Sequence, residues 1–415
     1  MGDYQHRAAK ILLQVNELAA ISDAGGMISR VYGTPAFIKA GNKIIAWMQL
    51  AGLETSIDNM HNIRGRLKGN KAGAGTLIIA SHFDTVVNAG KFDGPLGIIM
   101  GLDIIGRLVQ NKTILPFNIE LVAFCDEEGT RFHTTYLGSK VIAGSFDRNL
   151  LNKTDSDGIT LQSVIQQLGG DPEQLDNDSL AKEKLMGYFE IHIEQGPVLY
   201  AAGIPVAVVT AIAGQQRAEL VFTGEAAHAG TVPMDMRRDA LCCAALCITA
   251  IEGFAVNNKT SIVATVGKLD ITNAASNVIP GQVKCTLDIR SPDRLLLSAA
   301  CDTLHKRMTE ICGERNISFT WNKIQETGPV ACDPVMNEML KRSIEVSGYE
   351  VVELVSGAGH DAVPLAAICP VSMLFVRCFK GISHNPLEEV ESKDIAAAIE
   401  VADNFLLHLI TKFNN

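Results

Sequence analysis

Basic residues are too few in this sequence to favour a polyanionic partner. Its 36 lysines and arginines stand against 46 aspartates and glutamates, which gives a formal net charge of -10. Nucleic acid and anionic membrane surfaces attract clustered positive charge, so we expect neither as a partner. Long apolar runs are also missing: no segment approaches the roughly 20 residues of a membrane-spanning helix. The N-terminal stretch lacks the compact apolar core and cleavage site of a signal peptide.

Closely paired cysteines are a second absence. Ten cysteines are present, but no two of them are spaced as C-x-x-C. Cys242, Cys243 and Cys247 lie in an apolar, helix-like stretch, where a free thiol behaves as a small hydrophobic group. We therefore expect reduced, mostly buried thiols, no cysteine metal site and a cytoplasmic enzyme.

What the sequence does contain is an alternation of apolar, strand-like runs with longer helical patterns. Its 415 residues are too many for one typical domain. Strands are expected at 76–82, 118–124, 187–193, 204–213 and 370–377, and helices at 95–112, 136–144, 334–347 and 392–412. Such alternation predicts an α/β fold with a mixed, mostly parallel sheet sandwiched by helices.

The middle of the chain follows a different order. A strand pattern at 215–225 is followed by a helix at 237–254, strands at 260–270 and 282–290, a helix at 295–311 and a strand at 316–324. This β-α-β-β-α-β order resembles the ferredoxin-like α+β unit. We therefore expect a catalytic domain formed by residues 1–213 and 329–415, with residues 214–328 inserted as a lid and dimerisation domain.

Three consecutive acids follow one of the expected strands. Asp126, Glu127 and Glu128 lie in the segment FCDEEGTRF. Like charges in a row repel, and each costs free energy to remove from water. Either the segment is a solvated turn or a positive group lies opposite it.

Histidines and carboxylates stand at the ends of other expected strands. His82 ends one strand, with Asp84 two residues on to orient its imidazole, and Asp93 follows in a glycine-flanked loop. His192 lies within a strand and His384 in a late turn. Each alone has an ordinary interpretation, such as a buried core histidine or a helix N-cap. Because ligands gather at the carboxyl edge of a parallel sheet, the set favours a Zn, Mn, Co or Ni site.

Eight short motifs occur in a fixed order along the chain. They are SHFDTV, KFDGPLG, CDEEGTRF, EIHIEQGPVL, GEAAHAGTVPMDMRRDA, SNVIPG, SGAGHDA and GISHNP. Together they resemble the two-metal amidohydrolases of the aminoacylase/carboxypeptidase superfamily. The chain is most similar to the carbamoylase branch, which includes allantoate amidohydrolase, N-carbamoyl-L-amino-acid hydrolase and β-ureidopropionase. The resemblance covers almost the whole chain.

The resemblance implies a centre of two divalent metal ions. The family's ligand positions correspond to His82 and His192 for one ion, Glu128 and His384 for the other, and Asp93 for both. Glu127 would be the general base for a hydroxide shared by the ions. The implied reaction cleaves the ureido group of allantoate or an N-carbamoyl-L-amino acid and releases ammonia and carbon dioxide. The alternative is an aminoacylase or dipeptidase of the same superfamily.

The inserted segment would complete the substrate end of the site. The resemblance makes His228 an oxyanion donor in the active site of the partner subunit of a homodimer, although the residues alone fit a turn-capping histidine. Arg290 would bind the substrate carboxylate bidentately; an ion pair with Asp288 is the alternative. Further substrate contacts expected by motif match are Gln195, Arg217, Asn277, Gly359 and His360. The sequence leaves open the choice of ureido substrate and the role of Asp126.

Overall fold

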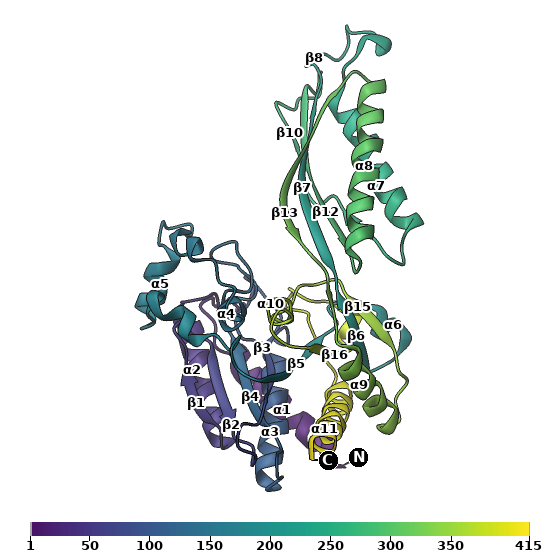
Figure 1. Cartoon of the computed structure of the whole chain (residues 1–415). Coiled ribbons are helices and arrows are strands. Elements are labelled where there is room, and N and C mark those ends of the chain that lie inside the picture. Colours follow the sequence, from purple (N-terminus) through teal and green to yellow (C-terminus); the bar gives the residue numbers. More distant parts are fainter. Residues whose placement is uncertain (1, 415) are drawn as a thin grey trace. The chain divides into compact units, whose positions relative to one another are not determined.

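The structure, a computed structural model, describes residues 2–414, which divide into two compact units (Figure 1). Unit 1 comprises Met1–Thr210 and Cys332–Asn415, and unit 2 comprises Ala211–Ala331. The expected inserted segment, residues 214–328, lies within unit 2.

The larger sheet has nine strands in the order β1-β2-β4-β3-β5-β16-β6-β14, with β15 paired to β6. Their bounds are β1 Glu54–Ile57, β2 Ile63–Leu67, β3 Thr76–His82, β4 Asn118–Phe124, β5 Leu185–Ile193, β6 Val206–Ile212, β14 Val330–Ala331, β15 Glu353–Ser356 and β16 Val371–Val376. The central strands β4, β3, β5 and β16 are parallel, whereas β1, β2, β6 and β14 pair antiparallel. The expected mixed, mostly parallel α/β fold is confirmed.

Helices cover this sheet. α3 (Pro95–Gln110) packs on β3 and β5, and α9 (Pro334–Val346) packs on β16. α1 (Gly2–Ala19) and α11 (Ser392–Asn414) pack against each other although they come from opposite ends of the chain (Figure 1). The remaining helices of unit 1 are α2 Pro35–Leu50, α4 Leu137–Ile142, η1 Arg148–Asn152, α5 Leu161–Gln167, η2 Pro172–Asp178, α6 Val198–Ala202, α10 Ala362–Leu365 and η4 Phe379–Gly381.

The centre of the sheet explains its continuous apolar strands. β3 reads TLIIASH, and all seven of its residues are buried, as expected of a parallel strand covered on both faces. α3 can approach the sheet closely because Gly97 has no side chain: a Cβ there would collide with the carbonyl oxygen of Ile191. This close packing holds the loop before α3 against the ends of the neighbouring strands.

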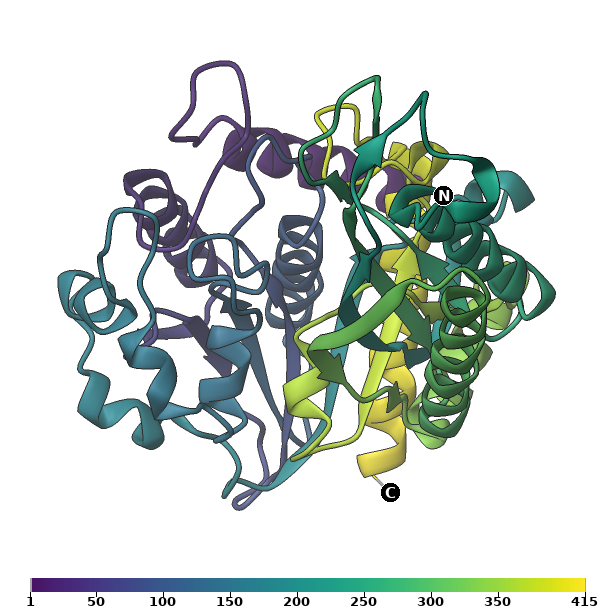
Figure 2. The ribbon, with the colours of Figure 1, turned by 90° about the horizontal axis from the view of Figure 1, so that it is seen from above.

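Unit 2 has a five-stranded antiparallel sheet in the order β10-β12-β7-β13, with β9 paired to β12. Its strands are β7 Gly214–Thr223, β9 Val263–Thr265, β10 Leu269–Ile271, β12 Gln282–Ser291 and β13 Ser318–Thr327. α7 (Ala240–Asn257) and α8 (Arg294–Glu314) lie side by side on one face (Figure 1 and Figure 2). β8 (Ala227–His228) and β11 (Val278–Ile279) form a separate pair, and η3 is Met234–Met236.

Two expected elements of unit 2 differ in their bounds. The strand expected at 260–270 is two short strands, β9 and β10, interrupted around Gly267; glycine often marks such a break. The helix expected from residue 237 begins at Ala240, because the Asp239 side chain caps it by accepting the N–H groups of Leu241 and Cys242.

α7 is the one helix of the described chain that is long and apolar enough for a membrane span. The expectation that no segment approaches this length is therefore wrong for α7. One side of the helix, including Cys243, Ala244 and Ile251, packs into the core of unit 2, whereas Leu246 and Val256 on other sides are exposed. Helices packed in globular cores reach the same length and composition.

Candidate metal centre and active site

Four parallel strands bring the expected ligands to one edge of the larger sheet. His82 is the last residue of β3, and Glu127 and Glu128 follow the end of β4. His192 lies near the end of β5, and His384 follows β16. Because the carboxyl ends of parallel strands meet at one edge, residues far apart in the sequence become neighbours there.

His82, His192 and Asp93 form the first group of donors, and all three are buried. Nε2 of His192 lies 3.1 Å, and Nε2 of His82 3.6 Å, from Oδ1 of Asp93. The two imidazole rings stack with their centroids 5.8 Å apart. Gly94, whose φ is 82°, lets the loop pass the His82 ring, since a Cβ there would lie 2.5 Å from the ring atom Nδ1.

Asp93 also belongs to a second group, with Glu128 and His384. Oδ2 of Asp93 lies 3.1 Å from Nε2 of His384, and this nitrogen lies 3.5 Å from Oε1 of Glu128. The two oxygens of one carboxylate therefore face two different groups of donors. A carboxylate that bridges two metal ions has this arrangement.

Backbone carbonyls orient both buried imidazoles. Nδ1 of His82 lies 3.2 Å from the carbonyl oxygen of Asp84, and Nδ1 of His192 lies 2.9 Å from that of Ile193. An N–H at Nδ1 that donates to these carbonyls leaves Nε2, which faces Asp93, free to bind a metal ion.

The Asp84 carboxylate positions the glutamate pair. Its Oδ1 accepts the backbone N–H of Glu127 at 3.0 Å, and its Oδ2 accepts that of Glu128 at 3.2 Å. The same carboxylate lies 3.7 Å from Nδ1 of His82, outside hydrogen-bond range. Asp84 therefore contacts the imidazole through its main chain and the two acids through its side chain.

Burial makes the acids at this edge difficult to ionise on their own. Burial raises the pKa of Glu127 well above its usual range, and the charge of Glu128 raises it further. Burial and the nearby Asp93 raise the pKa of Glu128 to about 7. Both side-chain oxygens of Asp126 are buried and accept no hydrogen bond from the described residues. Bound cations would offset this repulsion, so the donors suit divalent ions.

Three side chains hold Asp93 in place. Gln195 Nε2 donates to its Oδ2 at 2.8 Å, and Ser383 Oγ lies 2.9 Å from the same oxygen. Glu388 accepts the backbone N–H groups of Phe92 and Asp93, and its Oε2 lies 2.9 Å from Ser383 Oγ, whose single hydrogen can go to either carboxylate. Sequence reasoning predicted Gln195 as a substrate contact and missed Ser383 and Glu388. Both residues lie close to His384 in the sequence, which could have marked them as candidates for the site. Only the fold shows that they hydrogen-bond to Asp93.

His360 and Gly359 also lie at this edge of unit 1. The His360 ring is buried, with its centroid 4.6 Å from that of His192, and its Nε2 lies 2.7 Å from Ser356 Oγ. Burial lowers the pKa of His360 well below its usual range. Gly359 makes room for the Tyr136 hydroxyl, with which a Cβ would collide.

Comparison with known proteins decides the family. A sequence model described as "Peptidase family M20/M25/M40" matches residues 78–408. The chain belongs to this family. It is 39% identical to allantoate deiminase 2 of Glycine max over 95% of this chain and 88% of that protein. It is 36% identical to N-carbamoyl-L-amino acid amidohydrolase of Geobacillus stearothermophilus over 94% of this chain and 95% of that protein.

A solved structure shares the fold over almost the whole chain. The crystal structure of a hydantoinase/carbamoylase family amidase from Burkholderia multivorans matches with a TM-score of 0.91 and 33% identity, and the match covers 97% of this chain and 98% of that one. With the curated relatives, it confirms the carbamoylase branch. This M20 family member is therefore an amidohydrolase that acts on C–N bonds, and its family is metal-dependent.

The remaining expected substrate residues of this M20 hydrolase lie in unit 2, in two groups. His228 is exposed on β8, where its Nδ1 accepts the N–H of Gly230 at 3.0 Å, and the carbonyl of Asn277 accepts the N–H of Ala229. Arg217 Nε donates to Asp288 Oδ2 at 3.0 Å, and Arg290 Nε donates to Asp288 Oδ1 at 2.8 Å. The alternative ion pair of Arg290 with Asp288 is therefore present, and Arg217 shares it.

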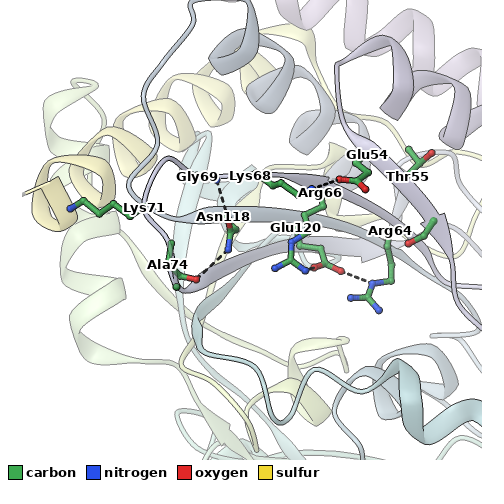
Figure 3. Close-up of a pocket in the computed structure, with 12 residues that line it drawn as sticks. Glu54, Thr55, Arg64, Arg66, Lys68, Gly69, Lys71, Ala74, Asn118 and Glu120 are labelled. Carbon is green, nitrogen blue, oxygen red and sulfur yellow. Dashed lines mark hydrogen bonds and ion pairs between the residues drawn. The ribbon is translucent and has the colours of Figure 1, made fainter.

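A cavity of about 770 Å³ lies elsewhere in unit 1, lined by residues of β1, β2 and β4 and of the loop before β3 (Figure 3). It includes Asn118, at the start of β4, whereas the candidate metal-binding residues His82 and Glu128 lie at or beyond the opposite ends of β3 and β4. Its Arg64 and Lys68 are paired with Glu120 and Glu54. We assign this cavity no part in the chemistry.

Glu388→Gln is expected to weaken metal binding by about 10- to 100-fold, the usual effect of losing a partner of a ligand. The amide oxygen can still accept the backbone N–H groups of Phe92 and Asp93, but the NH₂ group that replaces the second oxygen cannot accept the Ser383 hydroxyl, and the negative charge is lost. Metal titration of the apoprotein measures the change. The matched control is the exposed neighbour Glu389: Glu389→Gln should bind metal normally. Equal affinities in the two variants would contradict a positioning role for Glu388.

Proposed function

We propose that the chain hydrolyses the ureido group of allantoate or of an N-carbamoyl-L-amino acid, releasing ammonia and carbon dioxide. The observation that carries this proposal is the shared Asp93 carboxylate, whose two oxygens face two donor groups beside Glu127. The names of the relatives, allantoate deiminase and N-carbamoyl-L-amino acid amidohydrolase, support the substrate class.

Two divalent ions fit the donors. His82 and His192 would hold one, Glu128 and His384 the other, and Asp93 both. Imidazole and carboxylate donors without thiolate suit Zn, Mn, Co or Ni. When bound, such ions supply Lewis acidity and lower the pKa of a bound water toward neutrality.

Glu127 would carry the proton. Its backbone N–H donates to the Asp84 carboxylate. Its own carboxylate lies close to His82, from the first group of donors, and to Glu128, from the second. As a carboxylate, Glu127 would accept a proton from the attacking water and return it to the leaving nitrogen.

Residues of both units would bind the substrate. Arg290 offers a guanidinium for the carboxylate that both substrate classes carry, and His228 would donate to the developing oxyanion in the partner subunit's site. The other proposed contacts are Gln195, Arg217, Asn277, Gly359 and His360. Residues 214–328 would then act as lid and dimerisation domain, and the enzyme would be cytoplasmic.

A panel of three substrates tests the function. The metal-reconstituted enzyme is incubated with allantoate, N-carbamoyl-L-methionine and N-carbamoyl-β-alanine, and ammonia release is measured; N-acetyl-L-methionine and a dipeptide are run beside them, with the freed amino acid as the readout. We expect ammonia from at least one ureido substrate. Turnover of N-acetyl amino acids or dipeptides without any ammonia release would instead favour the aminoacylase or dipeptidase alternative.

Arg290→Lys is expected to raise KM by about 10- to 100-fold with little change in kcat, because a lysine cannot grip a carboxylate with two parallel hydrogen bonds. The sharper readout uses the substrate with its carboxylate converted to an amide, for which the variant and the wild type should differ little. Arg307→Lys, at an exposed ion pair of α8, is the control and should match the wild type. An equal loss with both substrates would contradict carboxylate recognition by Arg290.

The homodimer is an expectation from the family resemblance, and we place its interface on the outer side of α7, where the Leu246 side chain is 46% exposed. Leu246→Asp is expected to shift the protein from dimer to monomer in light scattering after size exclusion, since burying an unpaired carboxylate opposes association. Leu295 is more exposed, at 79%, and lies on α8, so Leu295→Asp is the control and should remain dimeric. A wild type that is monomeric at every concentration would contradict the dimer.

A further inference from the structure

Three cysteines from two helices converge inside unit 2, apart from the carboxylate and imidazole centre. Cys243 and Cys247 lie on α7, and Cys312 lies on α8; all three are buried. Their sulfur atoms all lie within 4.8 Å of one another, and those of Cys243 and Cys312 are 3.6 Å apart. None is in a disulfide.

The packing of α8 against α7 brings the three cysteines together. Cys243 and Cys247 are one turn apart on α7 and so present their side chains on the same face. Cys312 lies in the last turn of α8, which packs against α7. In the described chain, Cys285 and Cys301 share the same apolar core but belong to no such group.

We propose that Cys243, Cys247 and Cys312 bind one thiophilic divalent d¹⁰ ion of the Zn²⁺ or Cd²⁺ class. Three thiols would each release one proton as a sulfur–metal bond forms, leaving three thiolates around the ion. Thiolate donors select softer ions than the imidazole and carboxylate donors of unit 1. The bound ion would join the start of α7 to the end of α8.

The separations fit such an ion. A point equidistant from three sulfurs that are 3.6 to 4.8 Å apart lies roughly 2.1 to 2.8 Å from each, a range that includes the ~2.3 Å of a Zn–S bond. Cys243 also lies in the first turn of α7, where the positive end of the helix favours a thiolate. The cluster lies where two helix ends meet, so fraying of a terminal turn gives an ion access without unfolding the sheet.

Cadmium titration of the full chain, freed of metal, tests the site. Cd²⁺ bound to thiolates gives an intense charge-transfer band in the ultraviolet that imidazole and carboxylate donors do not give. We expect the full band to correspond to one cadmium ion bound at the thiolates, with ions bound in unit 1 adding nothing to it. Cys247→Ser and Cys312→Ser should each lose the band and one bound ion per chain. No band in the wild type, or an undiminished band in either variant, would overturn the proposal.

Two controls separate this site from other metal binding. Cys285→Ser, at a buried cysteine of the same core, and Asp93→Asn, in the other centre, should both keep the band. Wild-type crystals grown with Cd²⁺ give a readout that does not depend on variants folding. An anomalous peak between the three sulfurs would support the site, and cadmium bound only at the centre of unit 1 would overturn it.

Discussion

Glu127→Gln is expected to lower kcat by about 10²- to 10⁴-fold while both metal ions stay bound. Glutamine has the size and shape of glutamate but cannot accept a proton from water. The Asp84 contact with the residue 127 backbone does not involve the replaced group, so the loop should keep its conformation. Ammonia release gives kcat, and elemental analysis of the purified variant gives the metal content.

The two measurements together distinguish a base from a ligand. Glu127 lies in one donor group with His82 and Glu128, so a loss of metal in the variant would assign it to the ligands. Turnover at the wild-type rate would remove it as the base. Glu345→Gln, at an exposed carboxylate of α9, makes the same chemical change away from the site and should leave kcat and metal content unchanged.

Asp93→Asn is expected to abolish measurable activity and to remove both ions. This effect is larger than that expected for Glu127→Gln, which keeps its metal. An amide lacks the charge of the carboxylate and offers only one oxygen, whereas Asp93 faces His192 with one oxygen and His384 with the other. Gln195 donates to Asp93 and would face an NH₂ group in one amide orientation, which further disfavours the native arrangement. Elemental analysis and metal titration measure the loss.

A comparison with Glu128→Ala shows whether Asp93 is shared. Glu128 belongs to only one of the two groups that contain Asp93, so Glu128→Ala should lose one ion and keep the other. Asp157→Asn, in an exposed turn of unit 1, should lose none. An Asp93→Asn variant that keeps one ion at wild-type affinity would show that this carboxylate serves a single ion.

The sequence predicted what depends on local pattern. The fully apolar run of β3 and the strand pattern of β4 indicated strands buried on both faces, and each ended in residues that a core strand would not carry. His82, Glu127 and Glu128 therefore stood out as candidates, because burial of polar groups without partners is unfavourable; their assignment as ligands and general base came from the family resemblance. The roles of His228 and Arg290 came from the motif order and stay predictions, because their contacts in unit 2 are a backbone amide and Asp288.

Boundaries and local breaks were less predictable. The start of α7 at Ala240 depends on the Asp239 cap, and the helical pattern of the preceding residues hid it. The division of one strand into β9 and β10 depends on pairing with different parts of β12. Both are decided by particular hydrogen bonds, a side-chain cap in one case and strand pairing in the other, rather than by periodicity.

By itself, the sequence determined the fold class, the family and the chemical types of residue at the strand ends, because hydrophobic patterning and motif order are local properties. Only the tertiary structure decided which atoms meet. The two faces of the Asp93 carboxylate, its contacts with Ser383, and the meeting of Cys243, Cys247 and Cys312 join residues on separate elements. A search for C-x-x-C spacing predicts no cysteine site, because two packed helices rather than one turn bring these sulfurs together.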